Sequence, residues 1–201
     1  MRIPKSSTIV KQLPKLRSAL SVLLLTALIL SLFAASAQST QAATANLVKN
    51  GSFEKDTNGD GVPNSWTRFF PATATDKRVC NQSHAGACSL RLVGDLDTKD
   101  FRQEIPVNGL ANDEYILSVW TKKKDLVLGG GQARLSIQFH HTDGSSNFTV
   151  ILILAGSATW TLSQYSQAHS TENFDSITVF VHISADSGKV WFDKVKLVEV
   201  P

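Results

Sequence analysis

Charged residues are few in this 201-residue chain, and outside its first 37 residues the two signs nearly cancel. Lys, Arg, Asp and Glu make up 18% of the sequence, and the formal net charge is +3 at pH 7. The first 37 residues hold five of the 20 basic residues and no acidic residue, so the rest carries 15 basic and 17 acidic residues, a net charge of −2. This balance gives no electrostatic basis for binding nucleic acid or an anionic membrane surface.

The sequence also lacks the short motifs that carry common chemistries. It has no GxSxG nucleophile elbow, no HExxH zinc motif, no phosphate-binding glycine loop and no dinucleotide-binding fingerprint. No segment after the first 45 residues has a convincing 3.6-residue apolar period, which argues against amphipathic helices. Hydrophobic residues, at 42%, are too frequent for a disordered or collagen-like chain. We therefore expect a globular, monomeric, non-catalytic domain built from strands.

The amino-terminal segment has the layout of an export signal. Residues 1–18 are basic, residues 19–35 are apolar, and the small residues Ala35 and Ala37 stand at the end of the apolar run. This order predicts a signal peptide over residues 1–37, and the small residues Ala43 and Ala45 offer a second cleavage site. An uncleaved membrane anchor is the alternative, but the apolar run is slightly shorter than the roughly 20 residues of a membrane-spanning helix. We expect a secreted protein without membrane contact once the signal is cleaved.

Composition sets the next boundaries and suggests one cross-link. Residues 38–45 are rich in Ala, Thr, Gln and Ser and are expected to form a disordered leader, so that residues 46–201 are the folded domain.

This domain contains the chain's two cysteines, Cys80 and Cys88. In an oxidising compartment such a pair predicts a disulfide. A metal-binding or nucleophilic thiol pair is the weaker alternative, because the pair has neither CxxC spacing nor a neighbouring motif.

Alternation of apolar with polar residues dominates the rest of the sequence. It is clearest over residues 115–122, 134–140 and 177–184, where β-branched and aromatic residues recur at every second position. A period of two is typical of half-buried strands. Further strands are expected at 46–53, 87–93, 99–107, 147–154, 159–167 and 189–199. Short strands separated by Asn-Gly, Asp-Gly and Gly-Gly turns predict an all-β fold, a two-sheet antiparallel β-sandwich of the jelly-roll kind.

The outward positions of these strands carry the candidate ligand-binding residues. Rings and hydrogen-bonding side chains stand opposite the Leu, Ile and Val set, at Trp120, Phe180, Gln138, His140 and Arg134. If the strands lie in one sheet, these side chains share a surface that suits sugars, because sugar rings present C–H faces and hydroxyl edges. The alternative is that a loop covers Trp120 or Phe180 and that these rings only pack.

One loop has the composition of a cation site. Asp56, Asn58 and Asp60 place side-chain oxygens at alternate positions. The pattern matches the first half of the EF-hand loop, whose oxygens bind Ca²⁺. The second half is missing, because no Glu stands at the last ligand position and no helix is expected to follow. The loop is therefore either a calcium-binding loop of another kind or a solvated Asx turn.

Several segments together resemble one family in their order and spacing. They are Asn46–Glu54 followed by Trp66, then Cys88–Leu92, Gln103–Val107, Tyr115–Trp120 and Val190–Leu197. In this order they resemble the family 4/9 carbohydrate-binding modules of the galactose-binding-like jelly-roll group. The resemblance covers residues 46–199. It implies a two-sheet β-jelly roll that binds a polysaccharide or oligosaccharide without cleaving it.

The resemblance also implies a structural calcium ion. The acid that follows Ser-Phe in the family corresponds to Glu54, and the near-terminal acid corresponds to Asp193. Backbone carbonyls near Asn46 and Leu47, and others from the loop at residues 80–88, would complete the ligand set. Many relatives have a second acid directly after the near-terminal one, whereas this chain has Lys194.

A secreted, non-catalytic module that binds carbohydrate and holds calcium is the function that the sequence favours. A surface structural or adhesion domain that binds protein is the main alternative, because the same fold serves both uses. A small glycoside hydrolase or lyase is the third, and it would require two carboxylates about 5–10 Å apart in a groove.

Overall fold

The computed structural model describes residues 45–70 and 73–201. The expected signal peptide, residues 1–37, and all but the last residue of the expected leader lie outside these ranges. The chain divides into two units, Met1–Ala43 and Thr44–Pro201, and the described residues belong to the second. Among them, no helix is long and apolar enough to cross a membrane.

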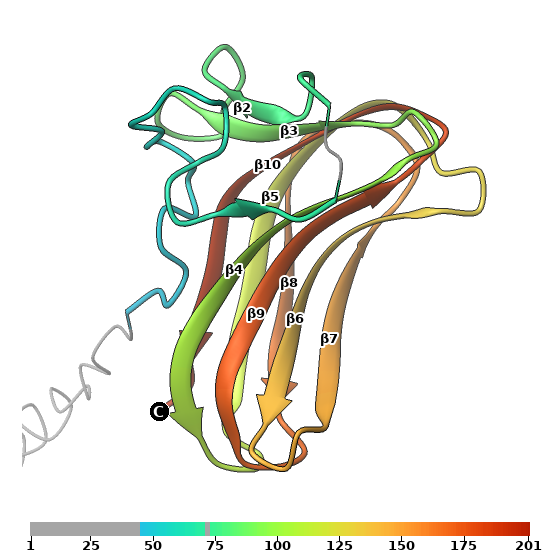
Figure 1. Cartoon of the computed structure of the whole chain (residues 1–201). Coiled ribbons are helices and arrows are strands. Elements are labelled where there is room, and N and C mark those ends of the chain that lie inside the picture. Colours follow the sequence, from blue (N-terminus) through green and yellow to red (C-terminus); the bar gives the residue numbers. More distant parts are fainter. Residues whose placement is uncertain (1–44, 71–72) are drawn as a thin grey trace, which may run out of the picture. The chain divides into compact units, whose positions relative to one another are not determined.

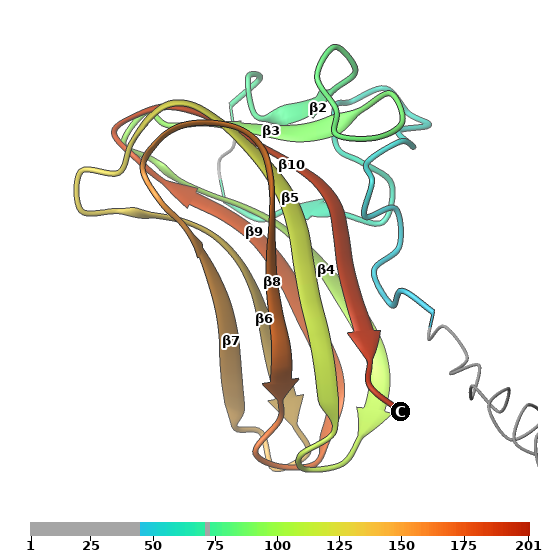
Figure 2. The same cartoon turned by 180° about the vertical axis from the view of Figure 1, so that it is seen from behind.

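Ten strands in the described part of the chain form two antiparallel sheets of five strands each. Sheet A contains, in spatial order, β1 (Thr67–Arg68), β4 (Thr98–Gly109), β9 (Phe174–Ser184), β6 (Gln132–His141) and β7 (Ser146–Ile153). Sheet B contains β2 (Lys77–Val79), β3 (Ser89–Val93), β10 (Ser187–Glu199), β5 (Glu114–Val127) and β8 (Gly156–His169). Figure 1 looks onto sheet A, and Figure 2 looks from behind onto sheet B. The predicted all-β, two-sheet antiparallel sandwich of the jelly-roll kind is confirmed.

The core lies between the sheets and consists of the inward positions of the alternating strands. Leu135 and Ile137 of β6, Val179 of β9, and Leu117 and Val119 of β5 are all fully buried. Burying a side chain of this kind contributes about 1.5–3 kcal/mol relative to leaving it exposed. The alternation of the sequence therefore decides which face of each strand packs and which faces outward.

A cluster of aromatic rings joins the two sheets. Tyr115 of β5 lies 5.7 Å from Phe139 of β6, and Phe139 lies 5.0 Å from Phe174 of β9, measured between ring centroids. Burial raises the pKa of Tyr115 to about 12, and the nearby carboxylates of Glu199 and Asp113 add to the rise. The phenol is therefore held neutral in the folded protein over the ordinary pH range.

A buried ion pair also connects the sheets. The Lys99 side chain points inward from β4 of sheet A, and its Nζ lies 3.1 Å from Oδ2 of Asp76, with both side chains fully buried. Lys99 Nζ also donates to the carbonyl of Val93 in β3 (2.6 Å). Asp76 Oδ1 in turn accepts from the backbone N–H of Val93 (2.8 Å). Each charge thus has its partner, which a buried charge requires.

The expected strand over 46–53 is wrong. This segment runs beside β10 without a regular ladder, and the Asn46 side chain takes over part of the pairing. Asn46 Oδ1 accepts from the N–H of Leu197 (3.0 Å), and Asn46 Nδ2 donates to the carbonyl of Val195 (3.1 Å). Phe53 has a φ of 56°, outside the strand region, and its ring is fully buried. Turns, and not a strand, therefore bring the apolar residues of this segment into the core.

The other expected strands are present, and two strands were not predicted. Most extend beyond their predicted ends, but the strand expected over 87–93 begins at Ser89 and the one expected over 147–154 ends at Ile153. β1 and β2 have two and three residues, which is too short for an alternation to be visible. The strand expected over 115–122 continues to Val127 as β5. Register shifts interrupt its pairing with β8, so the polar residues Lys123–Asp125 break the alternation without ending the strand.

Candidate functional site

The outer face of sheet A, turned away from sheet B, is the first candidate surface. Strand register aligns its side chains in rows across the strands. In one row, Gln138 of β6 lies between Phe148 of β7 and Thr178 of β9, and Glu104 of β4 comes next. Because paired residues point to the same side of a sheet, these four side chains share one surface.

Two phenyl rings stand together on this face. Phe180 of β9 lies in the neighbouring row, in register with Ser136 of β6, and Val150 of β7 continues that row. The centroids of the Phe148 and Phe180 rings are 6.5 Å apart, and the ring planes are tilted by 38°. Phe148 is 54% exposed and Phe180 is half-buried. The pair offers an open apolar surface that Val150 extends along β7.

Hydrogen-bonding side chains flank the two rings. His140 Nε2 lies 2.8 Å from Thr178 Oγ1, and Gln138 Nε2 donates to Ser146 Oγ (3.0 Å). The Arg134 guanidinium donates one hydrogen bond along its own strand. These bonds hold the side chains in place, while the amide oxygen of Gln138 and the further N–H groups of Arg134 keep hydrogen-bonding capacity.

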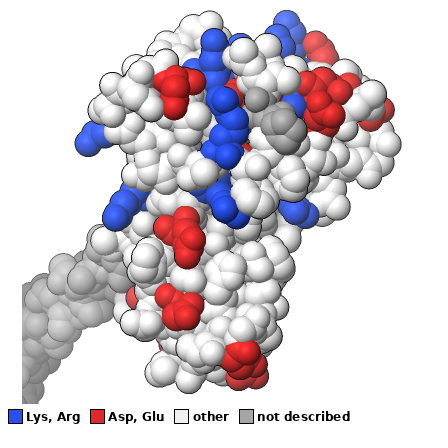
Figure 3. Space-filling view, in the orientation of Figure 1, with Lys and Arg blue, Asp and Glu red and all other residues white. Residues whose placement is uncertain are grey.

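Positive charge gathers at one end of this face. Figure 3 shows a column of Lys and Arg side chains over its upper part, with Asp and Glu side chains on both sides of the column and below it. The Arg102 guanidinium lies 3.8 Å from the ring centroid of Phe69, a cation–π contact. Nearby, His182 Nδ1 lies 2.6 Å from Asp100 Oδ1, and both side chains are largely buried. This carboxylate is therefore already partnered.

The shared surface expected for all the candidate residues is divided, because Trp120 lies in the other sheet. Phe180, Gln138, His140 and Arg134 belong to β9 and β6 of sheet A, whereas Trp120 belongs to β5 of sheet B. The alternation correctly placed all of them outward. It could not tell which sheet each strand joins, since an outward position looks the same in either sheet.

A loop covers part of Trp120. The imidazole of His84 stacks on the indole, with ring centroids 3.6 Å apart and an interplanar angle of 11°. His84 belongs to the loop that is closed by the Cys80–Cys88 disulfide. The predicted disulfide is confirmed, and it keeps this loop short over the outer face of sheet B.

Asp193, one of the two expected calcium ligands, is a fully buried carboxylate of β10. Its Oδ2 accepts from the backbone N–H groups of His84 (2.8 Å) and Ala85 (3.1 Å), and its Oδ1 accepts from that of Lys194 (2.7 Å). Burial raises the pKa of Asp193, and the three N–H donors oppose the rise. Asp193 thus anchors the disulfide-closed loop to the strand.

Glu54, the other expected calcium ligand, binds the same loop. Its carboxylate accepts from the N–H groups of Ala87 (3.1 Å) and Cys88 (3.3 Å). Leu47 is tied to β10 through its N–H, which donates to the carbonyl of Leu197 (2.9 Å). The structure thus brings both carboxylates to one loop, and brings Asn46 and Leu47 to the strand that carries Asp193.

This donor set fits a hard cation in part. Calcium prefers six to eight oxygen ligands, and two carboxylates that meet at one loop supply the preferred type. The described residues contain no group of three or more His, Cys, Asp or Glu side chains that could hold a metal. A cation held by Glu54 and Asp193 would therefore need backbone carbonyls for its remaining ligands.

The second candidate loop is closed by its own backbone. Asp56 Oδ1 accepts from Gly59 N–H (2.9 Å), and Asp56 Oδ2 accepts from Gly61 N–H (3.0 Å). The Asn58 side chain donates to Asp60 Oδ2 (2.9 Å). These bonds describe an Asx turn, the alternative named for this loop. Calcium binding by Asp56, Asn58 and Asp60 stays a prediction.

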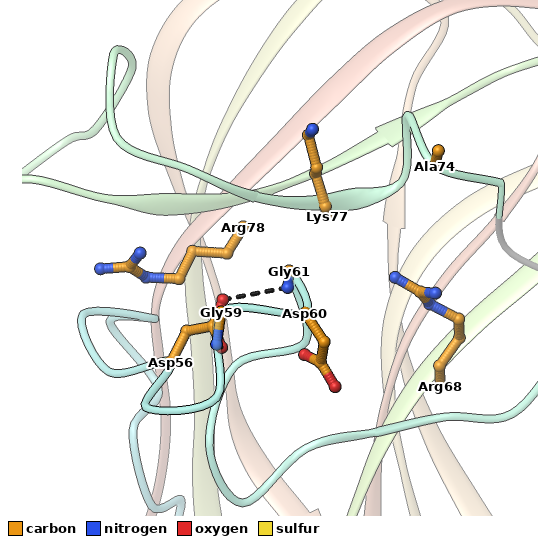
Figure 4. A pocket seen from close by; sticks show the side chains of 8 residues that line it. All are labelled: Asp56, Gly59, Asp60, Gly61, Arg68, Ala74, Lys77 and Arg78. Atoms are coloured by element: carbon orange, nitrogen blue, oxygen red, sulfur yellow. Dashed lines mark hydrogen bonds between the residues drawn. The ribbon is translucent and has the colours of Figure 1, made fainter.

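Basic side chains surround the acids of this loop. Figure 4 shows Asp56 and Asp60 in a pocket of about 480 Å³ whose lining also includes Arg68, Lys77 and Arg78. Three positive charges beside two negative charges weaken the attraction of the pocket for a cation.

Phe148 is the site residue that sequence reasoning missed. It follows Asn147 at the start of an apolar run in which both strand phases are hydrophobic, so the alternation does not distinguish the inner face from the outer. The outward residues of β7, Phe148, Val150 and Leu152, are 54%, 37% and 61% exposed. Phe148 and Phe180 lie together because β7 and β9 are both neighbours of β6. The residues around Phe148 contain no information about which strands become neighbours.

No family model and no curated protein matches the chain. Several solved structures have a fold similar to that of this chain. A family 61 carbohydrate-binding module in complex with β-1,4-galactotriose has a TM-score of 0.52 and 16% identity, over 78% of this chain and 100% of that one. A xylan-binding domain of family 22 has a TM-score of 0.52 and 13% identity, over 79% of this chain and 96% of that one. The enzymatically active domain of tailspike protein 4 of bacteriophage CBA120 has a TM-score of 0.57 and 17% identity, over 77% of this chain and 21% of that one.

At such identities these likenesses show a common fold. The chain is a β-sandwich of the architecture found in carbohydrate-binding modules, over nearly the whole length of two of the three structures. The tailspike match shows that a similar fold also occurs within an enzymatically active domain, of which it covers 21%.

Proposed function

We propose that the outer face of sheet A binds a carbohydrate chain and does not cleave it. The sugar rings would lie against Phe148 and Phe180, and their hydroxyl groups would bond to Gln138, Arg134 and His140. Apolar contact with the C–H faces of a sugar, combined with a few directed hydrogen bonds, is the usual chemistry of such recognition. Each contact contributes about 1 kcal/mol, so the affinity should be modest.

The observation that carries the proposal is the exposed pair of phenyl rings beside three hydrogen-bonding side chains. The Phe148 and Phe180 rings lie 6.5 Å apart on rigid strands, so the platform needs no rearrangement to receive a ligand. Two structures that share the fold support the chemistry, since one contains β-1,4-galactotriose and the other is a xylan-binding domain. The resemblance to family 4/9 modules points the same way.

A glycan array followed by calorimetry tests the proposal. The wild-type protein should bind at least one neutral oligosaccharide, and Phe180→Ala should weaken that binding about tenfold, as the loss of a stacked ring implies. Tyr165→Ala is the matched control, because Tyr165 is 45% exposed but lies on β8 of sheet B. Equal losses in both variants, or the absence of any bound glycan, would overturn the proposal.

We further propose a calcium ion held by Glu54 and Asp193. A cation there would neutralise two carboxylates that, among the described residues, form no salt bridge, and it would pin the disulfide-closed loop to β10. Chelation should then lower the melting temperature of the wild type, since a ligand bound by the folded state stabilises it. The same shift should persist in Asp56→Asn, which alters the second loop. An unchanged melting temperature with chelator would contradict this site.

We also propose that the protein is exported. The amino-terminal layout predicts a signal peptide, and the Cys80–Cys88 disulfide fits an oxidising compartment. Amino-terminal sequencing of secreted protein should give a start after Ala37 or Ala45. Protein retained in the cell with an intact Met1 would contradict export.

Binding to a protein is the second candidate function, and the apolar row on β7 favours it. Phe148, Val150 and Leu152 are exposed on the outer side of this edge strand, and Leu154 is exposed directly after it. Exposed apolar edge strands tend to associate with other chains. If this function were correct, Leu152→Lys and Phe180→Ala would both abolish protein capture, and no glycan would bind.

A further inference from the structure

A hollow on the outer face of sheet B lies outside the carbohydrate surface proposed above. Strand register explains why it forms. Ser118 of β5 pairs with Gln164 of β8 on one side and with Lys196 of β10 on the other. Ser118 is small and nearly buried, whereas its outward neighbours along β5, Ile116 and Trp120, are large. A small residue between two large ones leaves a notch across the sheet.

The notch is a true pocket with an apolar wall. Its volume is about 260 Å³, and Trp120, Leu162, Ile116 and Val198 line it together with polar groups. His84 of the disulfide-closed loop stacks on one face of the Trp120 indole, so the loop lies directly beside this wall of the pocket. The ring that forms the wall is therefore held in place by the loop.

Two ammonium groups stand on the β10 side of the pocket. Lys194 and Lys196 both line it, and among the described residues neither forms a salt bridge. Between Asp193 and Lys196 the register with β5 shifts, and Lys194 has a φ of 52°, in the left-handed region. Such bulges re-aim side chains. The carboxylate of Asp193 accepts hydrogen bonds from three backbone N–H groups, one of them from Lys194, and forms no salt bridge with either lysine, although the positive charge of Lys194 opposes the rise that burial causes in the pKa of this carboxyl.

We propose that this pocket binds one carboxylate-bearing sugar unit, a hexuronate. The carboxylate would pair with Lys194 and Lys196, the ring would contact Trp120 and Leu162, and the hydroxyls would reach Ser118 and Gln164. An apolar wall opposite two free ammonium groups suits a ligand with one charged edge and one C–H face. The volume is below that of drug-sized pockets, which fits a single unit rather than a long chain. This second site is independent of the carbohydrate site on sheet A.

Titration of the protein with galacturonate, with galactose as the neutral match, tests the proposal. The two sugars differ in the carboxylate, so galacturonate should bind and galactose should bind at least about tenfold more weakly, as expected for a charge-assisted contact. Lys196→Gln should weaken galacturonate binding about tenfold, and added salt should weaken it in the wild type. Lys189→Gln is the matched control, because Lys189 is an exposed lysine of the same strand outside the pocket.

Two further variants locate the site. Trp120→Ala should reduce galacturonate binding, and Phe180→Ala should leave it unchanged. Because Trp120 also packs against His84, the lysine variants keep the test valid if Trp120→Ala folds poorly. The proposal is overturned if galactose and galacturonate bind equally, if Lys189→Gln loses as much as Lys196→Gln, or if Phe180→Ala abolishes galacturonate binding.

Discussion

The two sheets are built from strands with the same alternation of apolar and polar residues, but their outer faces have different shapes. On sheet A, the rows around Phe148 and Phe180 form an open platform. On sheet B, the disulfide-closed loop lies over Asp193 and stacks His84 on Trp120, and a pocket of about 260 Å³ lies beside Trp120. If both proposed sites are correct, the open platform receives an extended chain and the pocket receives a single unit. A loop closed by one disulfide would then help to decide which ligand this face of sheet B accepts.

The buried ion pair that connects the two sheets should give the largest loss of stability when it is broken. Lys99→Met removes the ammonium group that bridges the sheets and leaves Asp76 buried without its partner. Breaking a buried pair in this way should cost about 3–5 kcal/mol of unfolding free energy, measured by denaturant titration. Lys189→Met, at an exposed position, should change stability by less than about 0.5 kcal/mol. A loss below about 1 kcal/mol for Lys99→Met would show that the bridge is not needed.

Removal of the disulfide should affect ligand binding on sheet B but not on sheet A. Replacing Cys80 and Cys88 together by Ser opens the loop and should lower the unfolding free energy by about 2.5 kcal/mol, the value expected for so short a closed loop. Galacturonate binding on sheet B should weaken, because the loop holds His84 against Trp120, which lines the pocket there. Neutral glycan binding on sheet A should stay as in the wild type. Equal losses on both faces, measured by calorimetry, would show that the loop supports the whole fold rather than one face.

A third change sharpens the role of the platform. Phe148→Ala should weaken neutral glycan binding about tenfold, roughly 1.4 kcal/mol, while the melting temperature stays nearly constant because the ring is 54% exposed. Leu152→Ala is the control, since Leu152 is exposed on the same strand two rows away. A larger loss in Leu152→Ala than in Phe148→Ala would place the ligand elsewhere on β7.

The smallest effect concerns the aromatic junction between the sheets. Burial raises the pKa of Tyr115 to about 12, so the folded state favours the neutral phenol and the unfolded chain ionises first as the pH rises above about 10. The stabilisation is complete below pH 10 and is lost between pH 10 and 12. Between pH 9 and 11 the wild type should lose about 1 kcal/mol more than Tyr115→Phe. Parallel stability curves for the two proteins would contradict a buried neutral phenol.

Strand positions and their inner faces could be predicted from the sequence because alternation is a local signal. Residues 177–184 illustrate this, since every predicted inward residue of β9 is buried. The same signal failed at residues 46–53, where turns and the Asn46 side chain replace a ladder. It was also absent at β1 and β2, which are too short to alternate.

The candidate site was less accessible to sequence reasoning, because it depends on which strands become neighbours. Phe180 and Gln138 share a face since β9 pairs with β6, whereas Trp120 belongs to the other sheet. Nothing within residues 115–122 distinguishes these outcomes. Phe148 escaped notice because both phases of its strand are apolar. The loop that covers Trp120 could be expected to close through its cysteines, but not to lie over this sheet.

The proposed platform on sheet A can be located by mapping the amide chemical shifts of the wild-type protein during titration with a neutral oligosaccharide that it binds. We expect shifts on β6, β7 and β9 around Gln138, Phe148 and Phe180, with the loop from Cys80 to Cys88 unaffected. Shifts confined to that loop and to β5 would contradict it.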